Sequence, residues 1–292
     1  MPSLFRLFAA LPLWLLHGLG AAAGWLTFAL SPTYRRRFFA NAAQAGYGFS
    51  QVKAAVGHAG RMVFEMPRIW LGQLPNCTII NGECAEKAYA KGKGIVFLTP
   101  HLGCFEMSVQ AAAQRWSAEH GDITVLYRPA RQGWLAEILE TARNRPGVQA
   151  VPTTLSGVRQ MIKALRKGAA VGLLPDQVPP EGLGTWSPFF GRDAYTMTLA
   201  ARLVLQTGAA VIVARCERRS WGRGYSLHLQ ELEMPAGLAL EAAVAQINQA
   251  MEQTIRECPT QYLWGYGRYK KPRVERTERA DAADGAKAEE KS

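Results

Sequence analysis

Short apolar runs alternate with amphipathic stretches along most of this chain. Seven runs predict β-strands, at Thr78–Ile80, Ile95–Thr99, Ile123–Tyr127, Val148–Val151, Ala170–Leu174, Ala210–Arg215 and Tyr225–Leu229. The stretches between them predict helices over 83–91, 104–118, 131–144, 155–167, 195–207 and 238–257. Strands separated by helices of this length build an α/β domain around a largely parallel sheet. Only a short segment separates the last two strands, so we expect a hairpin there and a mixed sheet flanked by helices.

The first 33 residues form a separate apolar segment. Leu7–Leu30 is 24 residues long and carries no formal charge, enough to cross about 30 Å of hydrocarbon as a helix. Arg35, Arg36 and Arg37 follow, and basic residues flank the cytoplasmic end of a membrane helix. We therefore predict that 1–33 is a membrane anchor and that the rest of the chain is cytoplasmic. A helix at the membrane interface and a cleaved signal peptide are the alternatives, although the arginines oppose export.

The rest of the chain divides into a large domain and a tail. Residues 34–72 predict amphipathic helices, interrupted at Pro67, that either pack on the core or rest on lipid. With the strands that follow, they make a predicted domain over 34–273. Residues 274–292 are charged and show no periodicity, which predicts disorder.

Charge and cysteine content narrow the classes of partner. The chain carries a net charge of +11, and its last 18 residues hold six acidic and four basic side chains, so the body is more basic still. A basic body favours anionic partners: membrane surfaces, phosphorylated ligands or nucleic acid. The cations are interleaved with Trp, Phe and Leu, and no nucleic-acid motif is present, so we expect no nucleic acid. The five cysteines are irregularly spaced, which predicts neither a disulfide framework nor a metal site.

The most informative motif lies where the strand at 95–99 ends. His101 follows Pro100, and Glu106 stands five positions further on. A histidine beside a carboxylate can serve as a general base with an orienting partner. Five residues turn a helix by about 500°, so the two side chains can face each other only if His101 precedes the helix. Taken alone, the pair also fits a strand-capping histidine near a solvated glutamate.

Two more predicted strands end in polar residues. Arg128 and Arg131 follow the strand at 123–127, where they could clamp a phosphate or polarise a carbonyl, or could simply be solvated. Asp176 follows the strand at 170–174 and could bind a donor, orient an arginine or cap a turn. Ligands bind at the carboxyl ends of parallel strands, so we expect His101, Arg128 and Asp176 to be neighbours in one site.

Two aromatic segments also carry cations. Trp186–Arg192 reads as a loop that lines an apolar channel, lies on the membrane or packs on the core, with Thr196 and Thr198 beginning the next helix. Gln261–Arg273 could contact lipid headgroups, phosphosugars or RNA, or dock on the sheet. The chain has no nucleophile elbow, P-loop or His-Glu-x-x-His motif, so we expect no covalent acyl-enzyme.

Together these motifs resemble the lipid A late acyltransferases, the family of the lauroyl and myristoyl transferases, over roughly 5–273. After the N-terminal anchor, the shared blocks are His101 with Glu106, Tyr127–Pro129, Leu174–Gln177, Pro188–Gly191, Pro259 to Trp264 and Arg268–Lys270. The family tends to have a histidine and paired arginines after the last tryptophan. This chain has Gly265-Tyr266-Gly267-Arg268 there, so it departs in a segment expected to contact the acceptor.

The resemblance implies a glycerolipid-acyltransferase-like fold and transfer of an acyl chain from acyl carrier protein to a hydroxyl of a lipid A precursor. The reaction would take place on the cytoplasmic face of the bacterial inner membrane. It needs no cofactor beyond the carrier's phosphopantetheine. His101 would be the base and Glu106 its orienting partner. Substrate or oxyanion contacts are expected from Arg128, Gly103 and Asp176, and phosphate, headgroup or carrier contacts from Arg131, Arg192, Arg268 and Lys270.

Two alternative functions share part of this pattern. A lysophosphatidate-type glycerolipid acyltransferase uses the same His-x4-acid chemistry, but that class usually shows a Pro-Glu-Gly-Thr block where this chain has Pro175-Asp176-Gln177. A non-catalytic, membrane-anchored binder of anionic lipids would need the basic aromatic surfaces and not the His101–Glu106 pair.

Overall fold

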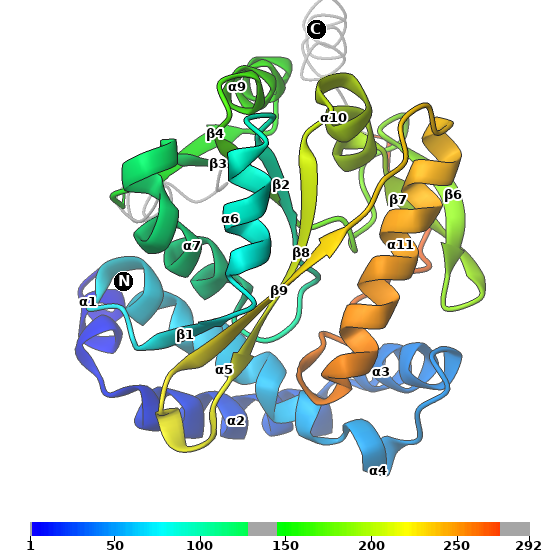
Figure 1. Ribbon diagram of the computed structural model, residues 1–292. Coiled ribbons are helices and arrows are strands. Elements are labelled where there is room, and N and C mark those ends of the chain that lie inside the picture. Colours follow the sequence, from blue (N-terminus) through cyan, green and yellow to red (C-terminus); the bar gives the residue numbers. More distant parts are fainter. Residues whose placement is uncertain (1, 128–144, 275–292) are drawn as a thin grey trace, which may run out of the picture.

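The computed structural model describes residues 2–127 and 145–274, and Figure 1 shows a central sheet with helices on both faces. The sheet has seven strands in the order β1-β9-β8-β2-β5-β3-β4. They are β1 Cys77–Ile80, β2 Ile95–Leu98, β3 Ile123–Tyr127, β4 Val148–Pro152, β5 Ala170–Leu173, β8 Ala210–Arg218 and β9 Tyr225–Leu232. The pair β8–β9 is antiparallel, and every other pair of neighbours is parallel. The predicted mixed, largely parallel sheet is therefore confirmed.

The central strands are buried on both faces, as their uninterrupted apolar sequences require. In β2, Ile95 and Phe97 point into one core and Val96 and Leu98 into the other. The first core lies beneath α6 (Glu83–Ala90) and α7 (Phe105–His120), and the second beneath α9 (Leu155–Arg166), α10 (Leu199–Thr207) and α11 (Leu240–Glu257). The predicted helix 131–144 lies outside the described residues, as does the tail from residue 275.

A small hairpin corrects the predicted loop at 186–192 and the predicted helix start near 195. β6 (Gly184–Phe189) and β7 (Arg192–Met197) pair antiparallel around Phe190 and Gly191. Both turn residues have positive φ, 49° and 72°, which is the geometry that closes a two-residue hairpin. Thr196 therefore lies in a strand, and α10 begins at Leu199, directly after Thr198.

The N-terminal region consists of five helices, where one span over 7–30 and amphipathic helices over 34–72 are predicted. The predicted span is broken at Leu11–Pro12 into α1 (Pro2–Ala10) and α2 (Leu13–Leu30), because proline lacks an N–H and begins a new helix. α3 (Pro32–Gln44), α4 (Phe49–Val52) and α5 (Ala54–Leu71) follow. The predicted interruption at Pro67 is wrong, since α5 runs through it to Leu71. By length and composition α2 could cross a membrane, and about a quarter of it is buried against the protein.

Three glycines bring the backbones of α2 and α5 together. A Cβ on Gly60 would lie 1.9 Å from the Gly20 carbonyl oxygen and 2.7 Å from the Gly24 nitrogen. We predict that Gly60→Ala forces the helices apart and lowers the free energy of unfolding by about 1–3 kcal/mol, measured by thermal unfolding in detergent. Gly18→Ala, in the partner helix α2, is the matched control, because nothing lies within 4 Å of its Cβ. Equal stability of the two variants would contradict this close packing.

Candidate active site

His101 and Asp176 meet at the edge of the sheet where β2 and β5 end. These strands are parallel neighbours, so the residues that follow them lie side by side. The His101 Nδ1 atom is 2.7 Å from Asp176 Oδ1, and the His101 backbone N–H donates to Oδ2 at 2.9 Å. The predicted proximity of the two residues is confirmed. Their relation is more specific than predicted, because Asp176 is a direct carboxylate partner of the imidazole.

The environment of this pair keeps the carboxylate ionised and the histidine oriented. Asp176 is 2 % exposed. Burial would raise its pKa, but the charge of His101 and hydrogen bonds from its ring and backbone lower the pKa below its usual value. With Nδ1–H donating to the carboxylate, the other ring nitrogen, Nε2, is the atom that can accept a proton. The His101 ring also packs edge-on against Phe105, with the ring centroids 4.9 Å apart.

Glu106 lies in the first turn of α7 and lines the same cavity as His101. One carboxylate oxygen accepts a hydrogen bond from the Trp70 indole N–H at 3.1 Å. The predicted orienting action of Glu106 on His101 stays a prediction, whereas the carboxylate on Nδ1 in the structure belongs to Asp176.

Backbone hydrogen bonds hold the loop 101–104 from two sides. On one side, the Leu263 N–H donates to the His101 carbonyl at 3.1 Å and the Gly103 N–H donates to the Gln261 carbonyl at 3.0 Å. On the other, the Cys104 N–H donates to the Cys216 carbonyl at 2.8 Å. The segment 261–263 thus acts as a clamp on the His101 loop, a function that its aromatic and basic composition did not reveal.

Position 103 requires glycine, because the backbone there lies very close to the Cys216 carbonyl. Its φ is +58°, and a Cβ there would lie 1.9 Å from the Cys216 carbonyl oxygen. The Gly103 N–H, a predicted oxyanion donor, is already engaged by Gln261, and a donor with a partner gives little to a developing charge. The other predicted donor, Arg128, lies outside the described residues, and so does Arg131.

A buried ionic cluster lies behind the loop. Arg218 Nη2 donates to the Gly103 carbonyl at 2.7 Å, and its Nε donates to Glu65 at 2.9 Å. Glu65 also accepts from the Tyr225 hydroxyl and pairs with His17 Nε2, both at 2.9 Å. Burial would raise the pKa of Glu65, but the charge of Arg218 and hydrogen bonds from His17 and Arg218 lower it to about 2. Sequence reasoning missed this cluster, whose members lie far apart in the chain and follow no local pattern.

The remaining predicted contact residues fall into two groups. Arg192 and Lys270 are exposed, and each lies over a tyrosine ring, so their predicted contacts with phosphate, headgroup or carrier protein stay predictions. The predicted contact of Arg268 with a phosphate, headgroup or carrier protein needs correction. It is 2 % exposed and donates to the Tyr195 carbonyl at 2.8 Å and the Thr196 hydroxyl at 2.6 Å. A buried guanidinium of this kind cannot reach a headgroup, and it holds the C-terminal segment against β7.

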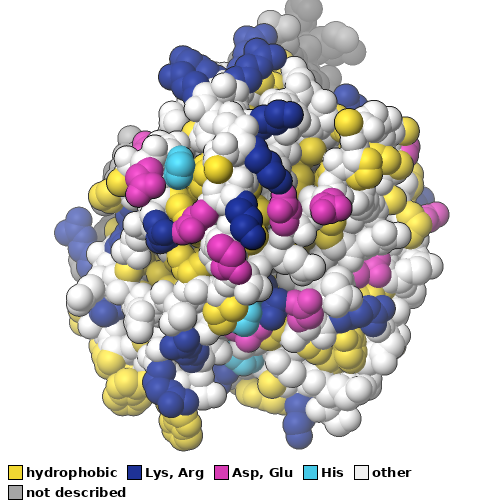
Figure 2. Space-filling view, viewed as in Figure 1, with side chains coloured by type: hydrophobic (Ala, Val, Ile, Leu, Met, Phe, Trp, Pro, Cys, Tyr) yellow, Lys and Arg dark blue, Asp and Glu magenta, His cyan; other side chains and the backbone are white. Residues whose placement is uncertain are grey.

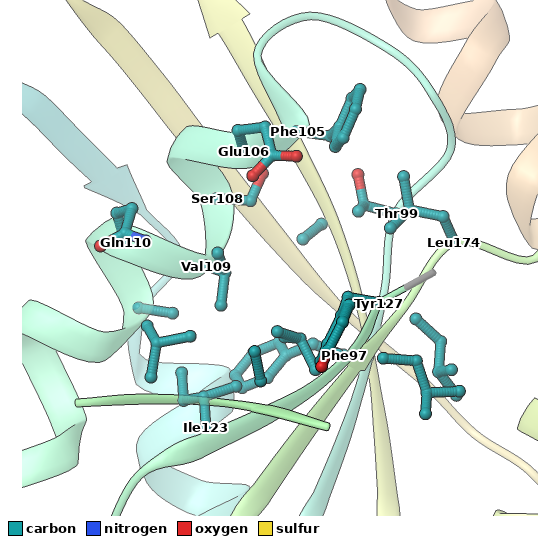
Figure 3. Close-up of a pocket in the computed structure, with 18 of the residues that line it drawn as sticks. Phe97, Thr99, Phe105, Glu106, Ser108, Val109, Gln110, Ile123, Tyr127 and Leu174 are labelled. Atoms are coloured by element: carbon teal, nitrogen blue, oxygen red, sulfur yellow. The ribbon is translucent and has the colours of Figure 1, made fainter. Parts of the chain in front are cut away.

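A cavity of about 560 Å³ extends from His101 between α7 and the sheet. Its walls are largely apolar and include Phe97, Val109, Ile123, Val125, Val148, Leu173, Leu227 and Leu229. Figure 3 shows Thr99, Glu106 and Ser108 toward one end of this cavity and Phe97 and Ile123 toward the other. The described residues contain no group of three or more His, Cys, Asp or Glu side chains placed to hold a metal ion.

Comparison with known proteins gives a family and distant relatives. The family model for bacterial lipid A biosynthesis acyltransferases matches residues 52–271. The chain is 26% identical over 194 residues to the lipid A biosynthesis lauroyltransferase of Escherichia coli K12, covering 66% of this chain and 61% of that protein. It is also 26% identical over 188 residues to the lipid A biosynthesis palmitoleoyltransferase of the same strain, covering 63% of this chain and 58% of that protein. Each alignment thus spans about three fifths of the relative. Because the family model covers most of the sequence, this chain belongs to the bacterial lipid A biosynthesis acyltransferase family.

Proposed function

We propose that this protein transfers a fatty acyl chain from an acyl carrier protein thioester to a hydroxyl group of a lipid A precursor. The observation that carries the proposal is the His101–Asp176 pair, whose histidine lines a largely apolar cavity. A base and a hydrocarbon site side by side are what the reaction needs. Family membership supplies the substrate class.

The acceptor hydroxyl is a poor nucleophile until a base takes its proton. His101 Nε2 takes the proton of the acceptor hydroxyl as its oxygen attacks the thioester carbonyl. The new C–O bond forms, the C–S bond breaks, and the imidazolium returns the proton to the departing carrier thiolate. General-base help of this kind contributes about 10²–10⁴ in rate. Asp176 keeps Nδ1 protonated and stabilises the imidazolium, as the acid of a serine triad does.

Glu106 lines the same cavity and is the second acid of the proposed site. The family resemblance implies an action of Glu106 on His101, and the Trp70 indole fixes one of the Glu106 oxygens. In the proposal, its negative charge adds to that of Asp176 when the imidazolium forms. We assign stabilisation of the oxyanion in the tetrahedral intermediate to Arg128. This cation follows β3 in the sequence, and β3 is the neighbour of β5 in the sheet.

The cavity accommodates the hydrocarbon part of the donor. Its volume of about 560 Å³ is within the usual range of small-molecule sites, about 300–1,000 Å³. Each methylene buried there contributes about 0.8 kcal/mol, so an apolar wall of this extent selects a fatty chain over a small acyl group. The basic body suits both an acidic carrier protein and a phosphorylated glucosamine acceptor. No cofactor beyond the carrier's phosphopantetheine is proposed, and the reaction is placed at the cytoplasmic face of the bacterial inner membrane.

The test is a reconstituted transfer reaction. Purified protein in detergent is mixed with acyl carrier protein charged with laurate, myristate or palmitate and with a lipid A precursor, and the products are identified by mass spectrometry. We expect the precursor to gain the mass of one acyl chain. Lysophosphatidate and acyl-coenzyme A serve as competing acceptor and donor. Acylation of lysophosphatidate with no product from the lipid A precursor would contradict the proposal in favour of a glycerolipid acyltransferase.

A further inference from the structure

The tip of the β8–β9 hairpin exposes a tryptophan with no covering partner in the described structure. Residues 219–223, here called the hairpin tip, contain the short 3-10 turn Ser220–Gly222. The Trp221 side chain is 87 % exposed, and its φ of 59° is uncommon for a bulky residue. An exposed indole held in a strained turn indicates a surface that binds something apolar.

Two arginines flank this indole and are held at the tip. Arg219 Nε donates to the Ser226 hydroxyl at 2.9 Å, and Arg223 Nε donates to the Ser220 carbonyl at 3.2 Å. Each keeps further N–H groups for an anion, and Trp beside Arg is the composition typical of the membrane–water interface.

The hairpin tip is continuous with the N-terminal helices. Gly222 packs so closely on α2 that a Cβ there would lie 2.4 Å from the Trp14 nitrogen. Ten of the fifteen large apolar side chains exposed in the described residues belong to α1–α5 and this tip: Leu7, Trp14, Leu19, Trp25, Leu26, Leu30, Phe39, Phe49, Val63 and Trp221. These elements run along the lower part of the molecule in Figure 1, and Figure 2 shows apolar and basic side chains together at its lower left edge.

Contacts between α2 and α5 decide how this face meets a bilayer. α5 lies against α2 through the Gly20–Gly60 contact, and Arg61 Nε donates to the His17 carbonyl at 3.3 Å. Arg68 of α5 also donates to the Ala9 carbonyl of α1, the helix directly before α2, at 3.2 Å. If α2 crossed the membrane, these arginines and Glu65 would enter the hydrocarbon with it, which is a large cost. A helix lying in the membrane plane buries only its outer apolar face in lipid.

We propose that the hairpin tip and the outer face of α2 form one surface that binds an anionic bilayer, with α2 lying in the plane of the membrane. Trp221 enters the interface and Arg219 and Arg223 bind lipid phosphates. This surface is independent of which acyl group or acceptor the enzyme uses.

Lipid titration in a flotation assay tests the hairpin tip. The full-length protein is diluted from detergent into vesicles of phosphatidylcholine alone or mixed with phosphatidylglycerol. We expect Trp221→Ala to weaken binding to both vesicles. The double variant Arg219→Ala/Arg223→Ala should weaken binding to the anionic vesicles by about 10- to 30-fold and leave the neutral ones unchanged. If both variants bind as the unsubstituted protein does, the proposal is overturned.

Matched controls come from α9, at the opposite edge of the molecule in Figure 1. Leu155 is 78 % exposed there, and Arg159 and Arg166 are exposed. Leu155→Ala and Arg159→Ala/Arg166→Ala should bind both vesicles normally, and an equal loss in these controls would show a non-specific charge effect and refute the assigned surface. Unchanged thermal unfolding of the tip variants separates lost binding from lost folding.

Cysteine accessibility tests the orientation of α2. Ala10→Cys and Thr33→Cys place a thiol just before and just after the helix, at exposed positions. In sealed vesicles, a membrane-impermeant maleimide should label both from the same side, with the unsubstituted protein giving the background from Cys77 and Cys84, the two cysteines that are not buried. Labelling from opposite sides would mean that α2 spans the bilayer and would refute the in-plane arrangement.

Discussion

Replacing His101 with alanine should lower kcat for acyl transfer by about 10²–10⁴ with little change in KM, because the variant loses the base and keeps the cavity. Asp176→Asn should cost a similar factor. An amide that donates to Nδ1 stabilises the wrong tautomer and leaves the proton on Nε2, the atom that must accept one. Both effects are measured by single-turnover and steady-state transfer in detergent.

Glu106→Gln is the matched control, since it neutralises the acid that lines the cavity without changing the size of the side chain. The structure places the carboxylate of Asp176, and not that of Glu106, on Nδ1, so we expect a smaller loss of kcat for Glu106→Gln than for Asp176→Asn. The reverse order would make Glu106 the orienting acid, as the family resemblance implies. Transfer at the normal rate by His101→Ala would refute base catalysis by this residue.

Arg218→Ala should be strongly destabilising. It leaves the Glu65 carboxylate buried without its cation, and breaking such a pair on one side costs about 3–5 kcal/mol. It also removes the hydrogen bond to the Gly103 carbonyl, so the His101 loop should loosen. The free energy of unfolding in denaturant is the measurement.

Two comparisons separate this effect from ordinary charge loss. Lys91→Ala breaks an exposed ion pair with Glu231 and should cost at most about 1 kcal/mol. The double variant Arg218→Met/Glu65→Leu removes both buried charges and should recover part of the stability, because no unpaired carboxylate remains. A double variant less stable than Arg218→Ala would contradict this account.

We predict that acid lowers the stability of the protein through the same buried cluster. The pKa of Glu65 is about 2 in the folded protein, below its ordinary value of 4.5. A lowered carboxyl pKa contributes stability that is fully present above pH 4.5 and is lost as the pH falls toward 2. Glu65→Gln cannot titrate, so its unfolding free energy should fall less steeply over this window than that of the unsubstituted protein.

Local patterns determined most of the sheet. Each of the seven predicted strands is present, because short apolar runs bounded by turn residues are a local signal for strands, both in the buried β2 and in the half-exposed β1. The hairpin of β6 and β7 was missed, since Pro188 is a loop signal and yet lies inside β6, whereas Gly191 marks only the turn between the two strands. The break between α1 and α2 at Pro12 has a local cause, the missing N–H of proline. The long uncharged run nevertheless favoured the prediction of a single span.

The sequence by itself determined that His101, Arg128 and Asp176 follow strand ends, and that family motifs surround them. Tertiary structure decided which of these groups touch. His101 and Asp176 stand 75 positions apart, and only the adjacency of β2 and β5 in the sheet brings the carboxylate onto the ring. The cluster around Glu65 and the docking of α2 on α5 were decided in the same way. Contacts between distant segments produce no periodic pattern in the sequence, so local patterns cannot predict them.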